Sequence, residues 1–266
     1  MGTSHPNYIG SARKYCCMMD WVRRIMGLAV ITGGGRGIGA AISRRLAIEG
    51  HRILLTYNND SQAAESVISD LRADGIDCVA AKVDCGDTDE VFILADHPWM
   101  KKGVDILVLN HGMYERRPAK DLSLTELERT MDVNFKGAVA VYTALSPHLN
   151  EDARIIAIGS QLGIKGSPHG ADYAASKAAL HAWARSLAIN LANTGQRINV
   201  IAPGAIDTDI IGNDSATKRK ERESEIPMGR VGDPEEIASV VSFLSGDDSS
   251  YMTGAILHVN GGLFLP

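Results

Sequence analysis

The chain alternates short apolar runs with longer helix-like segments, and this alternation constrains its fold more than any other feature of the sequence. From residue 28 onward, the strand-like runs cover residues 28–32, 52–57, 77–83, 105–110, 154–159, 197–202 and 255–259. The helix-like stretches cover residues 37–49, 61–73, 88–96, 123–149, 171–193 and 234–245. Strands that alternate with helices imply crossover connections between parallel strands.

Nearly continuous apolar strands indicate a sheet that is buried on both faces. We therefore predict a single doubly wound α/β domain of the Rossmann type, with a seven-stranded parallel sheet and helices on both faces. A chain of 266 residues suits one such domain, and neither a repeat nor a linker divides it. We place this domain at residues 27–266. Asp233 and Pro234, followed by two acids, are typical of a helix start and agree with this assignment.

Residues 1–26 do not share the alternating pattern, and we predict that they form an N-terminal extension. Three explanations stay open: a start codon assigned too early, a docking arm, or a transit peptide. In the first case Met18, Met19 or Met26 could begin the chain. The segment lacks the serine and arginine content of a transit peptide, which favours the first two explanations.

Charge and cysteine content argue against several function classes. The chain has 27 Lys and Arg against 32 Asp and Glu, a formal net charge of −5, and no long basic block. Binding to nucleic acid or to an anionic membrane therefore has no electrostatic basis. The apolar run at 25–31 is too short to cross a bilayer. The four cysteines form no CxxC pair, so we expect free thiols, a cytoplasmic location and no metal site.

A glycine-rich turn, TGGGRGIG at residues 32–39, follows the first strand and opens the first helix. Glycines suit such a turn because it requires unusual dihedral angles and because a side chain would obstruct a pyrophosphate. Free amide hydrogens at the start of the helix can then bind the anion. The turn therefore predicts a dinucleotide site at the carboxyl end of the first strand.

The second strand indicates which dinucleotide binds. NAD sites usually carry an acid near the end of this strand, where it binds the ribose 2′-hydroxyl. Here the strand ends in Tyr57, Asn58 and Asn59, and Asp60 follows in the loop. Arg36, inside the glycine-rich turn, could pair with a 2′-phosphate. The missing acid and the added cation favour NADP(H) over NAD(H), although Asp60 could fold back onto the ribose.

Tyr173 and Lys177, in YAASK at 173–177, are four residues apart and share one helix face. A free tyrosine has a pKa of about 10 and is a poor base near neutrality. Lowering that pKa to about 7 requires about 4 kcal/mol, which one cation about 4 Å away supplies at an effective dielectric constant of about 20. Lys177 is therefore expected to lower the pKa of Tyr173. Ser160 ends the fifth strand, where α/β sheets build their sites, and Asn134 is a polar amide in mid-helix.

In this order, the motifs resemble those of the classical short-chain dehydrogenase/reductase family, and the resemblance covers residues 28–263. It is nearest in style to 3-oxoacyl-carrier-protein reductases. The motifs are TGGGRGIG at 32–39, Asp84, NHG at 110–112, Asn134, Ser160, YAASK at 173–177, PGAIDT at 203–208, IPMGRVGDPEEIA and HVNGG. The family usually has Asn-Asn-Ala-Gly where this chain has Leu109-Asn110-His111-Gly112. We expect His111 to be a tolerated substitution with no role in proton transfer.

The resemblance implies a role for each residue. Tyr173 would exchange a proton with the substrate oxygen, while Lys177 lowers its pKa and binds the nicotinamide ribose. Ser160 would steady the developing alkoxide, and Asn134 would hold a water in a proton relay. The implied cofactor contacts are Gly33, Gly35, Arg36, Gly37, Ile38, Gly39, Asn58, Asp84, Asn110, Gly112, Tyr173, Lys177, Pro203, Gly204, Ile206 and Thr208. The resemblance also implies a homotetramer (or dimer) built from segments 123–149, 171–193 and 261–266.

The predicted function is an NADP(H)-dependent oxidoreductase that interconverts a ketone and a secondary alcohol on a small molecule. Two alternatives stay open: a 3-oxoacyl-carrier-protein reductase, and a non-catalytic protein that senses a dinucleotide. Residues 209–230 should form a lid beside the substrate, with the mixed charges of residues 218–223 on a solvated helix face. Candidate pocket residues are Ile210, Ile211, Ile226, Met228, Gln161, Leu162, His169 and Tyr114.

Overall fold

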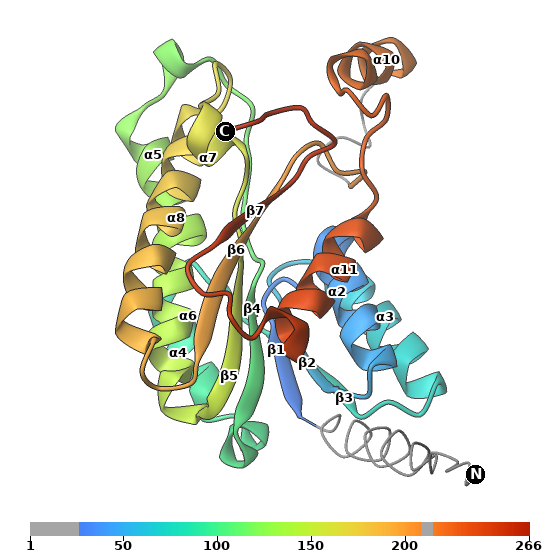
Figure 1. Ribbon diagram of the computed structural model, residues 1–266, viewed down its shortest axis with the longest axis vertical. Coiled ribbons are helices and arrows are strands. Elements are labelled where there is room, and N and C mark those ends of the chain that lie inside the picture. Colours follow the sequence, from blue (N-terminus) through green and yellow to red (C-terminus); the bar gives the residue numbers. More distant parts are fainter. Residues whose placement is uncertain (1–26, 209–214) are drawn as a thin grey trace, which may run out of the picture.

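A computed structural model of the chain describes residues 27–208 and 215–266. The predicted extension at 1–26 lies outside the described residues, as do Ile210 and Ile211 of the predicted lid. The sheet has seven strands in the order β3-β2-β1-β4-β5-β6-β7, and every neighbouring pair is parallel (Figure 1). The predicted fold class, a doubly wound parallel sheet, is confirmed.

The strands lie close to their predicted positions. They are β1 (Leu28–Ile31), β2 (Arg52–Tyr57), β3 (Cys78–Lys82), β4 (Val104–Leu109), β5 (Leu149–Ile158), β6 (Arg197–Pro203) and β7 (Ile256–Val259). Successive side chains of a strand point to opposite faces of the sheet. In β1, Leu28 and Val30 therefore join one hydrophobic core cluster, while Ala29 and Ile31 join the other.

Helices cover both faces of the sheet and bury these two clusters. One face is covered by α2 (Gly37–Ile48), α3 (Ser61–Ala73) and α11 (Pro234–Ser245). The other is covered by α4 (Thr88–Ala95), α6 (Gly137–Leu145) and α8 (Ala171–Leu191). Three further helices, α5 (Leu124–Met131), α7 (Leu162–Lys165) and α10 (Ala216–Glu225), lie toward the carboxyl ends of the strands, where α10 stands apart (Figure 1).

The single helix predicted over residues 123–149 is wrong in two respects. The helix is interrupted after α5 by a π-helical turn (Asp132–Lys136), and α6 begins only at Gly137. It also ends early, because Pro147 cannot continue a helix, and a 3₁₀ turn (Ser146–His148) follows α6. Leu149 is therefore the first residue of β5, whereas the sequence pattern placed the start of this strand at residue 154.

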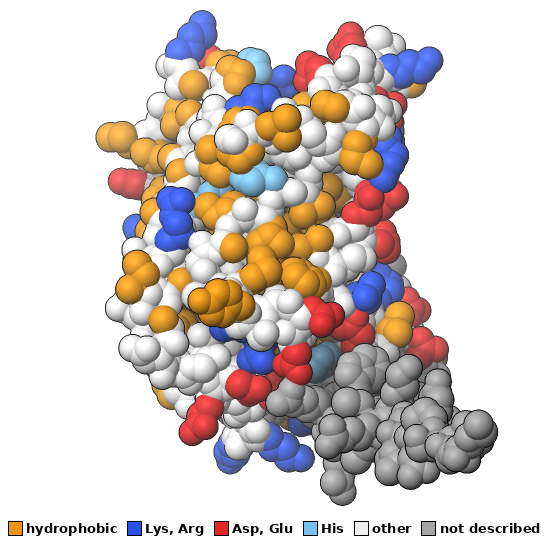
Figure 2. Space-filling view, in the orientation of Figure 1, with side chains coloured by type: hydrophobic (Ala, Val, Ile, Leu, Met, Phe, Trp, Pro, Cys, Tyr) orange, Lys and Arg blue, Asp and Glu red, His pale blue; other side chains and the backbone are white. Residues whose placement is uncertain are grey.

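The outer surface agrees with the charge balance of the sequence. Figure 2 shows hydrophobic side chains gathered over the middle of the face that carries β7 and α11, with basic side chains scattered among acidic ones around them. The exposed large apolar residues of this part of the chain include Phe243, Tyr251 and Leu265. Among the described residues, no helix is both long enough and apolar enough to cross a membrane.

One buried cation joins the sheet to a helix and yields a stability prediction. Arg197, at the start of β6, donates hydrogen bonds to the carbonyl oxygens of Ser249 (2.7 Å), Met252 (3.1 Å) and Gly246 (3.2 Å), directly after α11. We expect Arg197→Met to lower the free energy of unfolding by about 3 kcal/mol. Hydrogen bonds to charged groups contribute about 1.5–3 kcal/mol each, and water replaces only some of the bonds that the three carbonyl oxygens lose. Urea unfolding measures this change.

The matched control for this prediction is Arg44→Met. Arg44 pairs with Asp70 on the surface, with side-chain exposures of 44% and 59%. Exposed pairs of this kind contribute about 0–1 kcal/mol. Equal unfolding midpoints for the two variants would show that the contacts of Arg197 do not stabilise the fold.

Candidate active site

The candidate site lies where β1 and β4 are neighbours in the sheet. The chain leaves these two strands in opposite directions, and open α/β sheets bind their ligands at such a switch point. Residues that follow the two strands hold each other in place. The Asn110 side-chain amide donates to the carbonyl oxygens of Thr32 and Gly33, both at 3.0 Å, and the Asn110 backbone N–H donates to Thr32 Oγ1 at 3.0 Å.

The glycine-rich turn forms one wall of this crevice. Gly33 and Gly37 have positive φ angles of 63° and 50°, which non-glycine residues rarely adopt. A Cβ atom on Gly37 would lie only 3.2 Å from Thr208 Cγ2, so the turn and segment 203–208 face each other across a narrow gap. A side chain at Gly37 would fill that gap, whereas glycine leaves the N–H groups at the start of α2 open to an anion such as a pyrophosphate.

Two other residues of the turn pack inward. A Cβ atom on Gly35 would lie 2.9 Å from the Ala64 Cα atom, so Gly35 allows the turn to approach α3. Ile38 is half-buried and packs against the core beneath the turn. The predicted cofactor contacts of both residues stay predictions, while their packing shows how the turn is supported.

The residues that should distinguish NADP from NAD lie at the surface. Arg36 is exposed directly before α2, and Asn58 is exposed directly after β2. Asp60 caps α3, because its carboxylate accepts the Ala63 backbone N–H at 2.9 Å. The acid that could have folded back onto a ribose is therefore engaged at a helix start.

The other predicted cofactor residues follow β3 and β6. The Asp84 carboxylate accepts the Gly86 N–H at 2.8 Å, so one of its oxygens stabilises a turn. Pro203 ends β6, and a Cβ atom on the next residue, Gly204, would lie 2.7 Å from Asn260. Ile206 is 7% exposed and pairs with Gly232 in an isolated parallel bridge. These contacts hold segment 203–208 in position, and its roles toward the cofactor stay predictions.

Segment 203–208 is also tied to α10. Arg219, on α10, donates to both carboxylate oxygens of Asp207, at 3.2 and 2.7 Å. Its Nε atom donates to Glu223 at 3.2 Å. Bidentate pairs of this kind are directional as well as favourable. Arg219 therefore links the helix above the sheet to the residue beside Thr208.

Ser160, Tyr173 and Lys177 are brought together at the carboxyl end of β5. Ser160 follows the strand and is hydrogen-bonded to the Tyr173 hydroxyl. Lys177 Nζ donates to the Ile158 carbonyl oxygen at 2.8 Å and lies 5.7 Å from the centroid of the Tyr173 ring. A Cβ atom on Gly112 would lie 3.6 Å from Lys177 Nζ, so this glycine lies directly beside the buried ammonium.

The prediction that the pKa of Tyr173 is lowered is wrong for this geometry. Burial raises the pKa of Tyr173 to about 12, and the hydrogen bond with Ser160 acts in the opposite direction without reversing the shift. Burial also lowers the pKa of Lys177 to about 8. Desolvation of the phenol therefore dominates its pKa, and the Lys177 ammonium is directed at the Ile158 carbonyl. Tyr173 therefore keeps its proton at neutral pH and can donate it.

Asn134 is fully buried at the π-helical turn and pins the loop that follows β4. Its side-chain oxygen accepts the Met113 N–H at 2.7 Å, and its amide group donates to the Met113 carbonyl at 2.9 Å and to Ser176 Oγ at 3.1 Å. Both amide hydrogens are thus used. The water of the predicted proton relay would therefore have to bind polar atoms of Asn134 other than these two amide hydrogens.

Sequence reasoning missed a histidine that lies beneath Ser160. His181 is 2% exposed, and its Nε2 atom accepts the Ser160 backbone N–H at 3.4 Å. Burial lowers the pKa of His181 to about 4, so the ring is neutral and can accept. A Cβ atom on Gly163 would lie 2.9 Å from its Cε1 atom, which shows how tightly the ring is enclosed. The signal was its position four residues after Lys177, on the same helix face.

His111 belongs to the support of the crevice. Its Nδ1 atom lies 2.7 Å from Thr32 Oγ1. Burial lowers the pKa of His111 to about 3, and the charge of Lys177 acts in the same direction. The ring is therefore neutral at physiological pH, and the expectation that His111 has no role in proton transfer stays a prediction.

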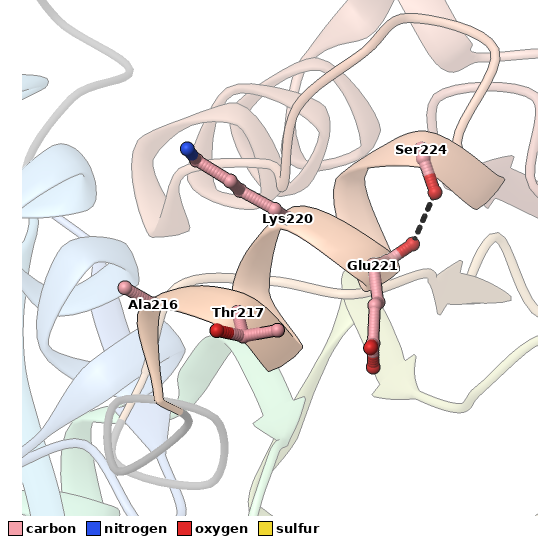
Figure 3. A pocket seen from close by; sticks show the side chains of 5 residues that line it. All are labelled: Ala216, Thr217, Lys220, Glu221 and Ser224. Carbon is pink, nitrogen blue, oxygen red and sulfur yellow. Dashed lines mark hydrogen bonds between the residues drawn. The ribbon is translucent and has the colours of Figure 1, made fainter.

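Two predicted pocket residues lie elsewhere. Ile226 and Met228 line a cavity of about 410 Å³ beside C-terminal residues Phe264 and Leu265, and Tyr173 is not among its lining residues. The apolar pocket predicted for them therefore faces the C-terminal segment. A second hollow, of about 350 Å³, runs along α10 and is lined by Ala216, Thr217, Lys220, Glu221 and Ser224 (Figure 3).

Four of the five residues that line the hollow on α10 have polar or charged side chains. The Lys220 and Glu221 side chains point in different directions, and Ser224 donates to the Glu221 carbonyl at 2.7 Å (Figure 3). α10 has no buried residue, which agrees with the predicted solvated helix face. None of the residues lining this hollow is a predicted site residue.

Comparison with known proteins places this site in a family. Residues 33–264 match the family model described as enoyl-(acyl carrier protein) reductase. Versicolorin reductase from Emericella nidulans is 36% identical over 251 residues, covering 89% of this chain and 95% of that protein. A 3-oxoacyl-[acyl-carrier-protein] reductase from Staphylococcus aureus is 32% identical over 240 residues, covering 89% and 98%.

Two solved structures are similar to this chain in both sequence and fold. A short-chain dehydrogenase from Burkholderia cenocepacia in complex with NADP is 34% identical, with a TM-score of 0.85 over 90% of this chain and 99% of that one. A blue fluorescent protein from a metagenomic library in complex with NADPH has the same TM-score at 36% identity, covering 90% and 98%. The chain belongs to the short-chain dehydrogenase/reductase family. It is an oxidoreductase acting on CH–OH and C=O groups with a nicotinamide dinucleotide.

Proposed function

We propose that this protein is an NADP(H)-dependent oxidoreductase that interconverts a ketone and a secondary alcohol, with Tyr173 as the proton donor and acceptor. The observation that carries the proposal is the convergence of Ser160, Tyr173 and Lys177 beside the glycine-rich turn. The two NADP(H)-bound relatives support the choice of dinucleotide. The experiment that tests it is reduction of simple ketones by the purified protein with NADPH.

In the direction of reduction, the Tyr173 hydroxyl donates its proton to the carbonyl oxygen of the substrate. Ser160 Oγ accepts the Leu162 N–H at 3.1 Å, which fixes the position of Oγ. The hydroxyl hydrogen of Ser160 can then be donated to the carbonyl oxygen of the substrate. When bound, the nicotinamide supplies the hydride to the carbonyl carbon, or takes it from the alcohol. Lys177 uses one hydrogen on Ile158, and its others are available to a ribose hydroxyl.

The two alternative functions, a carrier-protein reductase and a non-catalytic sensor, differ in their support. Reduction of a carrier-bound 3-oxoacyl group stays a prediction, supported by relatives of that name from Staphylococcus aureus at 32% identity. A non-catalytic sensor is set aside, because the relatives are named reductases and dehydrogenases. A homotetramer (or dimer) and a cytoplasmic location also stay predictions.

Preference for NADPH should depend on Arg36. We expect Arg36→Ala to raise the KM for NADPH about 10- to 100-fold, which is the effect of losing one charge-assisted hydrogen bond to a phosphate. The KM for NADH should change by less than about twofold, because NADH has no 2′-phosphate. Initial rates with each cofactor at saturating ketone measure both constants.

Arg44→Ala is the control for Arg36, because Arg44 lies on α2, the helix that Arg36 directly precedes, and pairs with Asp70. It should leave both constants unchanged. A wild-type protein with the lower KM for NADH would contradict the proposed preference for NADPH.

A further inference from the structure

A second tyrosine covers the proposed proton donor. Tyr114, in the loop after β4, meets Tyr173 edge to face, with ring centroids 5.0 Å apart and an interplanar angle of 73°. Tyr114 is half-buried, so part of its side chain is exposed beside Tyr173. Its proximity also contributes to the raised pKa of Tyr173, after burial. The side chain is therefore a direct neighbour of the reacting group.

The Tyr114 ring is fixed at both ends. Its hydroxyl donates to the His169 carbonyl oxygen at 3.1 Å, directly before α8. A Cβ atom on Gly170 would lie 2.6 Å from Tyr114 Cε2, so only a glycine lets the ring lie against the start of this helix. On the other side, Asn134 binds both backbone groups of the preceding residue, Met113. The hydroxyl hydrogen is therefore used on His169, while the ring packs on Tyr173.

The rest of the loop is hydrogen-bonded to the residues that precede α8. The backbone N–H of Arg117 donates to the His169 carbonyl oxygen at 3.3 Å, and that of Ala119 donates to the Pro168 carbonyl oxygen at 2.9 Å. The Arg117 guanidinium lies 3.5 Å from the carboxylate of Asp172, which is fully buried and directly precedes Tyr173. Asp172 also accepts the hydroxyl of Thr130, on α5, at 2.8 Å. The loop and the start of α8 therefore hold the two tyrosines in one fixed arrangement.

A carbonyl oxygen that bonds to the Tyr173 hydroxyl brings the substituents of its carbonyl carbon beside this ring. A flat ring can pack against a fixed aromatic surface without losing rotamer freedom, and an aromatic pair gains about 0.5–1.5 kcal/mol beyond the area that it buries. We propose that Tyr114 is a specificity-determining residue that favours flat, aromatic-fused ketones over saturated ones. This inference rests on the proposed ketone reduction and names its substrate class.

The test compares two bicyclic ketones that share a skeleton, β-tetralone with one aromatic ring and trans-β-decalone with none. In Tyr114→Ala, the ratio of kcat/KM for β-tetralone to that for trans-β-decalone should fall by about 2- to 13-fold relative to wild type, which is the aromatic gain expressed as a rate ratio. In Tyr114→Phe, which keeps the ring and loses only the bond to His169, the ratio should stay within about twofold of wild type.

The control is Tyr142→Ala, which removes a tyrosine that packs edge to face on Trp183. It should leave the ratio unchanged even if it lowers stability. Active Tyr114→Ala with an unchanged ratio would overturn the specificity role alone. A wild-type protein that quenches NADPH fluorescence or binds NADPH by calorimetry, yet reduces neither ketone, would overturn the proposed function and this inference with it.

Discussion

Tyr173→Phe is expected to reduce kcat for ketone reduction by about 10²- to 10⁴-fold while changing the Kd for NADPH by less than about threefold. Proton transfer by a positioned side chain accelerates reactions by about 10²–10⁴-fold, and phenylalanine has no proton to give. The ring contact with Tyr114 survives, because it involves only carbon atoms of the two side chains. Steady-state kinetics and NADPH fluorescence titration measure the two quantities separately.

Tyr251→Phe is the matched control, because Tyr251 is fully exposed and remote from the strand ends that carry the site. It should behave as wild type. A Tyr173→Phe protein with a kcat within tenfold of wild type would show that another group supplies the proton. Loss of NADPH binding in the same variant would instead show that the hydroxyl holds the cofactor.

Gly39→Ala is expected to raise the Kd for NADPH more than about a hundredfold and to lower stability by about 1–3 kcal/mol. A Cβ atom on Gly39 would collide with the Gly33 carbonyl oxygen and lie 2.6 Å from Asn110 Nδ2. Neither can move freely, because Asn110 Nδ2 donates to the carbonyls of Thr32 and Gly33. The added methyl group must therefore displace the turn. Calorimetric titration and urea unfolding measure the two effects.

Gly246→Ala provides the comparison. Gly246 has a φ angle of −91°, and a Cβ atom there would lie no closer than 3.7 Å to another atom. This variant should bind NADPH as wild type does. If Gly39→Ala also bound NADPH normally, the glycine-rich turn would not be the pyrophosphate site.

The parts of the fold that could be predicted are those whose signals are local. The apolar strands, the glycine-rich turn and the helix start at Asp233 and Pro234 can each be recognised from a few consecutive residues. The π-helical turn at Asp132–Lys136 has no such signal. It depends on the buried bonds of Asn134 to Met113 and Ser176, which are far from it in the sequence.

The site, too, could be predicted only where the signal is local in the sequence. Spacing alone predicted that Tyr173 and Lys177 share one helix face, and the structure brings both residues close to Ser160. Spacing could not show that the Lys177 ammonium is directed at the Ile158 carbonyl, or that burial dominates the pKa of Tyr173. Both depend on the solvent exposure and direction of side chains, which only the packed molecule determines.

The link between Arg219 and Asp207 bears on how such enzymes could be re-engineered. Asp207 sits between Ile206 and Thr208, and Thr208 in turn faces Gly37 across the crevice. A chimaera that exchanges α10 for the matching helix of a relative would alter the far side of the nucleotide crevice as well as the substrate side. Grafts that keep an arginine in register with Asp207 should therefore preserve cofactor affinity while the remainder of the helix is diversified.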